Sequence, residues 1–100
     1  MENLKWLSFE GCAHFDDWCL DRIVGEYSHT LEYLNIQNCS LVTERGIATL
    51  SKMKRLQTLV LGNHPNARNL ELVCLMLEDV LPNLTIRGII YCDESLLTKS

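Results

Sequence analysis

The chain has 100 residues, 47% of them apolar, and a formal net charge of −4. A chain of this length forms one small domain with a modest core. The negative charge, without any run of Lys or Arg, argues against nucleic acid or an anionic membrane surface as the main partner, and no apolar stretch reaches the roughly 20 residues of a membrane span.

Four segments with the same apolar pattern follow one another along the chain. They begin at Leu4, Leu31, Leu56 and Leu81, and each reads LxxLxL when Phe and Ile are counted with Leu. The leading leucines lie 27, 25 and 25 residues apart (4 to 31, 31 to 56, 56 to 81), within the range of about 20–29 residues of a leucine-rich repeat. The pattern predicts an α/β fold of about four repeats, a short leucine-rich-repeat solenoid with parallel strands on the concave side and helices on the convex side. We expect this domain to span 1–93 and a polar tail to follow at 94–100.

Each segment predicts one short strand whose side chains alternate between the core and the concave side. The expected core residues are Leu7, Phe9, Leu34, Ile36, Leu59, Leu61, Leu84 and Ile86. The residues between them should project from the concave side, and we predict that they bind a partner protein: Trp6, Ser8, Glu10, Tyr33, Asn35, Gln37, Thr58, Val60, Thr85 and Arg87, with Asn83 on the same face. Trp6 and Tyr33 occupy equivalent positions on adjacent strands, so their rings could stack.

The second half of each repeat predicts a short helix. Apolar residues correspond in three sets: Phe15 with Val42 and Ala67, Leu20 with Ile47 and Leu72, and Ile23 with Leu50 and Leu75. Asp16 and Thr43 are predicted N-caps, and Asn69 should take a similar role in the third helix. On that helix we expect Leu70, Val73, Leu77 and Val80 to form one buried stripe.

Cysteines and acidic residues are better explained by structure than by chemistry. The five cysteines (Cys12, Cys19, Cys39, Cys74 and Cys92) are odd in number and show no CxxC spacing, so we interpret them as small apolar residues in a reducing compartment. Cys12 and Cys39 should point inward at the same level. A zinc site at Cys12, Cys19 and Cys39 would need a fourth ligand that neither His14 nor His64 supplies convincingly, so we predict no metal and no cofactor.

No catalytic constellation is recognisable. Asp16 and Asp17 near His14 are expected to cap a helix, and together with Asp21 and Glu44 to form a solvated convex face. No nucleophile turn, Gly-rich phosphate loop or paired His motif is present. We therefore predict that the protein is not an enzyme and has no small-molecule substrate.

The two ends of the predicted solenoid need polar caps. The first repeat starts at Leu4, so we expect an additional segment or a partner to cover Leu4, Leu7 and Ile23. Ile89–Tyr91 could close the other end.

The residues between the anchors resemble a mitochondrial family that contains coupling factor B of ATP synthase and the distal membrane-arm assembly component of respiratory complex I. The similarity covers about residues 4–92. Asp-Asp-Trp-Cys-Leu at 16–20, Glu-Arg-Gly at 44–46 and Glu-Asp-Val-Leu-Pro-Asn at 78–83 are closer to the assembly component. The resemblance implies a location on the matrix side of the mitochondrial inner membrane, although no import signal is visible, and partners among the protein subunits of a respiratory-chain membrane complex. Factor B is associated with two thiols near the first turn, where this chain reads Glu10-Gly11-Cys12 and keeps one.

These observations favour a non-catalytic protein-interaction scaffold that assists assembly of the membrane arm of complex I. Two alternatives remain open. One is a factor-B-like coupling component of ATP synthase. The other is a set of substrate-recognition repeats from a ubiquitin ligase, which would require an F-box-like segment upstream.

Overall fold

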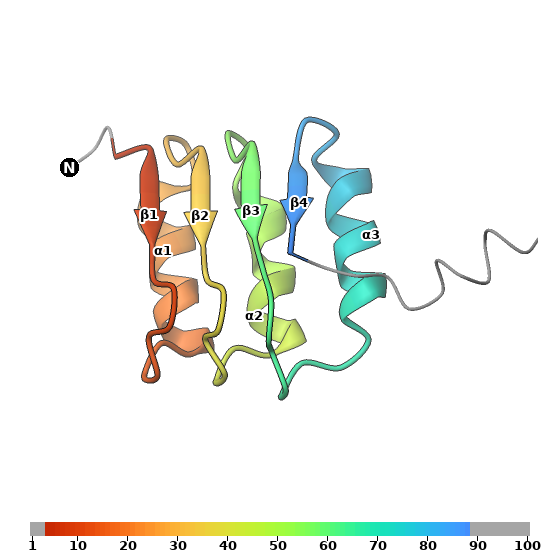
Figure 1. Ribbon diagram of the computed structural model, residues 1–100. Helices are drawn as coiled ribbons and strands as arrows, with labels where there is room; N and C mark the ends of the chain where they lie inside the picture. The colour runs from red at the N-terminus through yellow and green to blue at the C-terminus, as the bar shows by residue number, and fades with distance from the viewer. Residues whose placement is uncertain (1–3, 89–100) are drawn as a thin grey trace, which may run out of the picture.

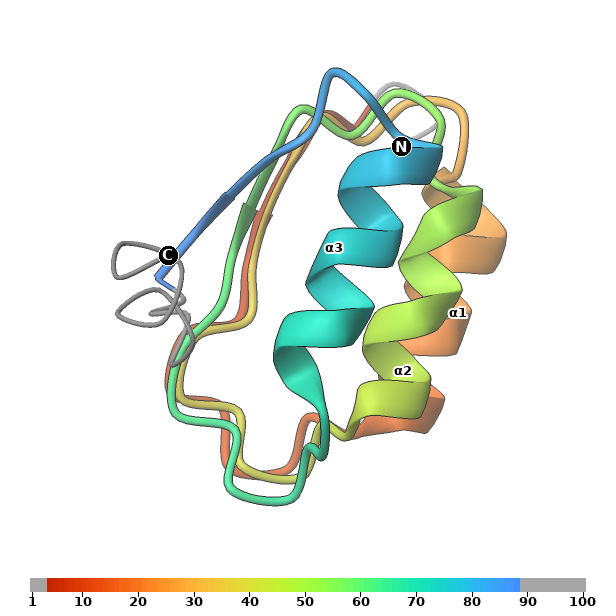
Figure 2. The same cartoon turned by 90° about the vertical axis from the view of Figure 1, so that its right-hand side faces the viewer.

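The four predicted strands form one parallel sheet in the order of the sequence. The structure, a computed structural model, describes residues 4–88. The strands are β1 (Trp6–Ser8), β2 (Tyr33–Asn35), β3 (Thr58–Val60) and β4 (Thr85–Arg87). On one face of the sheet lie α1 (Asp17–Tyr27), α2 (Glu44–Ala48), which continues as a 3-10 helix at Thr49–Lys52, and α3 (Leu70–Val80) (Figures 1 and 2). The α/β class and the parallel strands agree with the sequence analysis, whereas Cys92, the expected closing segment Ile89–Tyr91 and the tail at 94–100 lie outside the described residues.

The first three strands pair at equivalent positions of the repeat, whereas β4 is shifted by two residues, so that Ile86 lies opposite Leu59 where the alignment expects Leu84. Leu7 pairs with Leu34, Leu34 with Leu59, and Leu59 with Ile86. Beyond the strands the chain then turns at the same point of every unit, at four residues with φ between 60° and 86°: Gly11, Asn38, Asn63 and Gly88. Glycine and asparagine adopt this left-handed conformation most readily. The left-handed residue therefore recurs seven residues after each leading leucine, which is three residues after the end of β1, β2 and β3 but one residue after the end of β4.

The core lies between the sheet and the helices. The leading leucines Leu31, Leu56 and Leu81 are buried, and so are the inward-facing residues of the two inner strands: Leu34, Ile36, Leu59 and Leu61. In the outer strands, Leu7, Phe9 and Ile86 are only partly buried, since each outer strand has a described neighbour on one side alone. Leu20, Ile47, Leu50 and Leu77 cover this layer from the helices.

Two of the three predicted helix caps are confirmed. The Asp16 carboxylate accepts a hydrogen bond from the backbone N–H of Cys19 at 3.1 Å, and this bond holds the pKa of Asp16 below its usual value. The Thr43 hydroxyl accepts from the N–H of Arg45 at 3.2 Å. The prediction for Asn69 is wrong: Asn69 precedes α3, but its backbone is left-handed (φ 52°) and its side chain makes no capping hydrogen bond.

The predicted stripe on α3 is confirmed at Leu70, Val73 and Leu77 but not at Val80, and the alignment of Leu72 and Leu75 with core residues is wrong. Leu72 is 65% exposed, and Leu75 and Val80 are exposed as well, whereas Cys74 and Leu77 are fully buried. The cause is the connection before the helix. Position 61 lies nine residues before the start of α3 at 70, but the equivalent positions 9 and 36 lie eight residues before α1 at 17 and α2 at 44. One extra residue rotates an α-helix by about 100° relative to the alignment.

The acidic residue at the first position of α1 and of α2 makes hydrogen bonds to the segment that precedes the next helix. The Asp17 carboxylate accepts hydrogen bonds from the backbone N–H of Thr43, at 2.8 Å, and from the Thr43 hydroxyl. Glu44, at the equivalent position of α2, accepts from the N–H of Arg68 at 2.8 Å. The expectation that these two acids form only a solvated face is therefore wrong, because their partners lie about 25 residues further along the chain.

Gly46 provides the space for Asp17. A Cβ atom at position 46 would lie 2.2 Å from Asp17 Oδ1, which is too close for two non-bonded atoms. Replacing a helical glycine by alanine normally stabilises a protein by roughly 0.5–1 kcal/mol. We expect Gly46→Ala to do the opposite and to lower the free energy of unfolding in urea by about 1–2 kcal/mol, because it displaces the carboxylate from Thr43.

Gly25 in α1 is the matched control, because a Cβ atom there meets nothing within 4 Å. Gly25→Ala should raise the free energy of unfolding by about 0.5–1 kcal/mol. In an Asp17→Ala background, Gly46→Ala should lose most of its cost, which a double-mutant cycle measures. Equal effects of Gly46→Ala with and without Asp17 would show that the clash is not its cause.

Candidate functional site

The open face of the sheet, turned away from the helices, carries the exposed aromatic pair that the sequence predicts. Trp6 and Tyr33 are paired in register on β1 and β2. Their rings are stacked, with 4.8 Å between centroids and an angle of 6° between planes. Trp6 is 59% exposed, so one flat aromatic side chain remains available to a partner. Aromatic side chains of this kind are enriched among the residues that dominate binding energy.

The other residues predicted to bind a partner follow the same face of the sheet, and one of them, Asn35, is buried. Thr58 and Thr85 continue the row of Trp6 and Tyr33, and Ser8, Asn35, Val60 and Arg87 form the next row. Glu10 and Gln37 follow the carboxyl ends of β1 and β2. Asn35 is only 8% exposed, and its Oδ1 accepts a hydrogen bond from the N–H of Gln37, two residues further along the chain, at 2.9 Å. Asn35 therefore shapes the face and offers little contact to a partner.

A polar hollow at the amino ends of β3 and β4 was not predicted. Its volume is about 740 Å³, and it is lined by Glu32, Lys54, Arg55, Leu56, Gln57, Thr58, Asn83 and Thr85. Thr58, Thr85 and Asn83 are among the residues expected on this face. Lys54 and Arg55 were missed because they belong to the turn before β3, where strand alternation says nothing about direction. The Lys-Arg pair just before a strand was the available signal.

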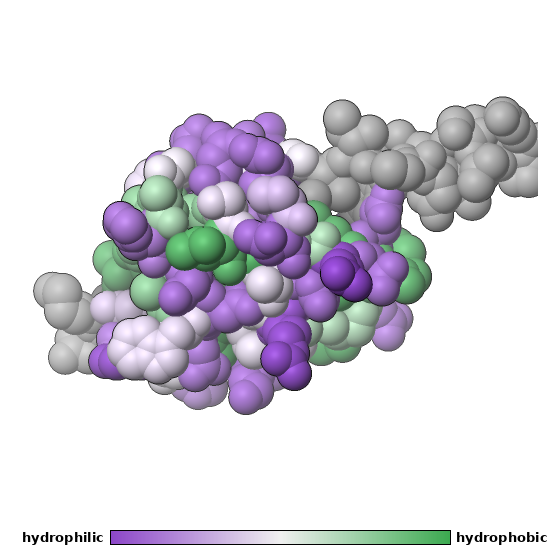
Figure 3. All heavy atoms as spheres, turned by 90° about the horizontal axis from the view of Figure 1, so that it is seen from below, coloured by the Kyte–Doolittle hydropathy of each residue, from purple (hydrophilic) through white to green (hydrophobic). Residues whose placement is uncertain are grey.

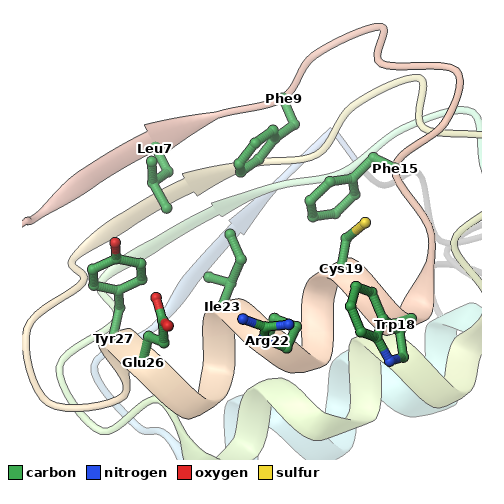
Figure 4. Close-up of a pocket in the computed structure, with 9 residues that line it drawn as sticks. All are labelled: Leu7, Phe9, Phe15, Trp18, Cys19, Arg22, Ile23, Glu26 and Tyr27. Carbon is green, nitrogen blue, oxygen red and sulfur yellow. The ribbon is translucent and has the colours of Figure 1, made fainter.

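A second hollow opens at the β1 end of the molecule and is apolar. Its volume is about 390 Å³, and its lining comes from β1, the following turn and α1: Leu7, Phe9, Phe15, Trp18, Cys19, Arg22, Ile23, Glu26 and Tyr27 (Figure 4). The rings of Phe9 and Phe15 are stacked, with centroids 4.4 Å apart, and the Arg22 guanidinium lies 5.1 Å from the centre of the Trp18 ring. Leu7 and Ile23, which we expected to need a cover, thus line one open cavity among the described residues.

The surface at the carboxyl ends of the strands, where the helices begin, is more hydrophilic than the lining of this cavity. Hydrophilic side chains cover most of it, with smaller apolar areas between them (Figure 3). This surface contains the turns with the cysteines. Cys39 is buried, and its thiol donates to the carbonyl oxygen of Phe9 at 3.0 Å. Cys12 is exposed, contrary to the expectation that it points inward, because no described residue packs on the outer side of the first turn.

The buried thiols are poor nucleophiles. Burial raises the pKa of Cys39, and burial with the nearby charges of Glu78 and Glu71 raises the pKa of Cys74 to about 11. A thiol must lose its proton to attack or to bind a metal. Within residues 4–88 no group of three or more His, Cys, Asp and Glu side chains is placed to hold a metal ion. In the same part of the chain no helix is long and apolar enough to cross a membrane.

The chain was compared with protein-family models and with curated proteins. No protein-family model matches the chain. The chain is similar to distal membrane arm assembly component 2 of Drosophila melanogaster. The two sequences are 41% identical over 88 residues, which are 88% of this chain and 31% of the relative. The chain thus spans about a third of the length of distal membrane arm assembly component 2.

His64 occupies the place of Cys12 and Cys39 in the third unit and is buried. Its Nδ1 lies 3.2 Å from the carbonyl oxygen of Cys39, so we assign the ring proton to Nδ1. Its Nε2 is buried and has no partner among residues 4–88. Burial disfavours the charged imidazolium and lowers the pKa of His64 from 6.5.

Stability should therefore decrease as the pH falls below about 6.5. In that range the unfolded chain binds a proton at His64 that the folded chain does not yet bind, which lowers the free energy of unfolding by at most about 1.4 kcal/mol per pH unit. His64→Asn keeps a donor near Nδ1 and should flatten this decline between about pH 7 and 5.5, measured from urea midpoints. The pKa values of Asp16 and Glu44 are also lowered, from 3.8 and 4.5, so their contribution disappears only at lower pH. An equally steep decline in the variant would assign the effect to another group.

Proposed function

We propose that this chain is a non-catalytic protein-interaction unit that acts in assembly of the distal membrane arm of mitochondrial respiratory complex I. The observation that carries the proposal is the 41% identity to distal membrane arm assembly component 2 over 88% of the chain. The motifs at 16–20, 44–46 and 78–83 support it, since they resemble the same group. The corresponding location is the mitochondrion, on the matrix side of the inner membrane.

We also propose that the fold is a leucine-rich-repeat solenoid. The parallel pairing of the strands in sequence order, the recurring left-handed turn and the helices on one face support this assignment. Solenoids of this kind bind proteins along a continuous surface and need no reactive group. The open face with Trp6 and Tyr33 is then the contact surface. Binding there would hold membrane-arm subunits together through shape and charge, without a chemical step.

Removal of the protein tests this function directly. Separation of native mitochondrial complexes by size, followed by mass spectrometry of each fraction, should show loss of late membrane-arm intermediates when the gene is deleted. Re-expression of the full-length protein should restore them. Unchanged complex I in the deleted cells would contradict the proposal, and a defect confined to ATP synthase would favour a factor-B-like role in its place.

A further inference from the structure

Positive charge gathers on the open face of a chain that is acidic as a whole. Lys54 and Arg55 line the polar hollow, and Arg87 lies on the same face. The one acid of the lining is Glu32, whose carboxylate lies 4.0 Å from Lys5 Nζ. By contrast, seven acids are on the helices, on the other side of the molecule: Asp17, Asp21, Glu26, Glu44, Glu71, Glu78 and Asp79. The net charge of −4 is therefore distributed unevenly: the open face carries Lys54, Arg55 and Arg87 against Glu10 and Glu32, whereas the helices carry seven acids against Arg22, Arg45 and Lys52.

The hollow also presents unused hydrogen-bonding groups. Within residues 4–88 the side chains of Gln57, Thr58, Asn83 and Thr85 make no hydrogen bond. Lys54 Nζ donates to the carbonyl oxygen of Ser51 at 3.3 Å, which leaves further protons of the ammonium free. Side chains that converge on a hollow without partners of their own are available to a polar ligand.

The aromatic pair and the polar hollow lie on one continuous row of the sheet. Trp6 pairs with Tyr33, Tyr33 with Thr58 and Thr58 with Thr85. With about 4.8 Å between neighbouring strands, this row is about 14 Å long, which five extended residues can cross. One short peptide segment can therefore contact the aromatic pair and the hollow together.

We propose that the open face binds an extended acidic segment of a partner protein. Its carboxylates lie at Lys54 and Arg55, its other polar groups meet Thr58 and Thr85, and an apolar side chain rests on Trp6. The inference rests on the proposed function, because it names the chemistry of the partner at the same face. Opposite charges across an interface guide association and exclude wrong partners, and the negative net charge of the chain disfavours a nucleic acid in this place.

The test uses the purified chain with Trp18→Phe, so that Trp6 is the one remaining tryptophan. The probes are a nine-residue fluorescent peptide in which glutamates alternate with leucine and threonine, its glutamine and lysine counterparts, and a single-stranded oligonucleotide. We expect the glutamate peptide to bind at least about tenfold more tightly than either counterpart, to change Trp6 emission, and to weaken as salt increases. Preference for the glutamine peptide, the lysine peptide or the oligonucleotide would overturn the proposal.

Charge reversal in the hollow is the second arm. Lys54→Glu with Arg55→Glu should weaken glutamate-peptide binding about tenfold, while Lys52→Glu with Arg22→Glu, the same change of charge outside the polar hollow, should alter it less than about twofold. Capture from mitochondria with the full-length protein then separates the two proposals. If the wild type and the Lys54/Arg55 variant capture complex I subunits equally, the acidic-segment inference fails and the function stands. If the wild type captures none but peptide binding depends on Lys54 and Arg55, the function fails and the inference stands.

Discussion

Replacing Leu77 by alanine is expected to lower the free energy of unfolding by about 2–5 kcal/mol. Leu77 is fully buried on the core side of α3, so the truncation removes apolar contact and leaves a cavity that the neighbours fill only partly. A domain of this size has a total stability of only about 5–15 kcal/mol. The variant should therefore unfold at a much lower urea concentration than the wild type, as followed by far-ultraviolet circular dichroism.

Leu72→Ala is the matched control on the same helix. Leu72 is 65% exposed, so its truncation should change the free energy of unfolding by less than about 0.5 kcal/mol. The pair decides between the two registers of α3, because the sequence alignment places Leu72 in the core. A cost for Leu72→Ala as large as that for Leu77→Ala would show that the helix is rotated about its axis and buries Leu72.

The strands could be predicted from the sequence because their pattern is redundant. Each unit places two core residues at a fixed distance from a leading leucine, and a shift by one residue would expose both. Helix α3 lacks this protection. Its sequence has apolar residues all around, including Leu72, Leu75 and Met76 on exposed sides, so the pattern fits more than one rotation. The rotation of α3 is set by the connection before it, which is one residue longer and ends at Asn69 in the left-handed conformation. The spacing of apolar residues does not predict the backbone conformation of a single asparagine.

The candidate site was predictable where it follows strand alternation and not where it depends on turns. Trp6 and Tyr33 were recognised because equivalent positions on parallel strands are neighbours. Asn35 follows the same alternation but is buried, and its side chain accepts a hydrogen bond from Gln37. This side-chain conformation does not follow from strand alternation. Asp17 was misread for a different reason. Its partner, Thr43, is distant in the sequence, and only the stacking of two units brings the carboxylate to the next helix start.

Alanine at Trp6 or Tyr33 should greatly reduce association with the partner. An exposed aromatic side chain at the centre of a protein interface commonly contributes about 2 kcal/mol or more, so we expect each substitution to weaken binding by about 30-fold. The cost to folding should be small, at most about 1 kcal/mol for a cross-strand pair on an open face. The measurement is the yield of membrane-arm subunits that co-purify with the tagged full-length protein, together with recovery of complex I in cells that lack the endogenous copy.

Trp18→Ala is the control, because it removes the same exposed side chain from the helix side of the molecule, where Trp18 is 66% exposed. If association depends on the open face, Trp6→Ala greatly reduces co-purification and recovery while Trp18→Ala retains both, with urea midpoints close to wild type in each case. The reverse result would move the contact surface to α1 and the apolar hollow beside it. Since the two tryptophans lie on different layers of the fold, this comparison assigns the interaction to the sheet or to the helices even while the contacting subunit is unidentified.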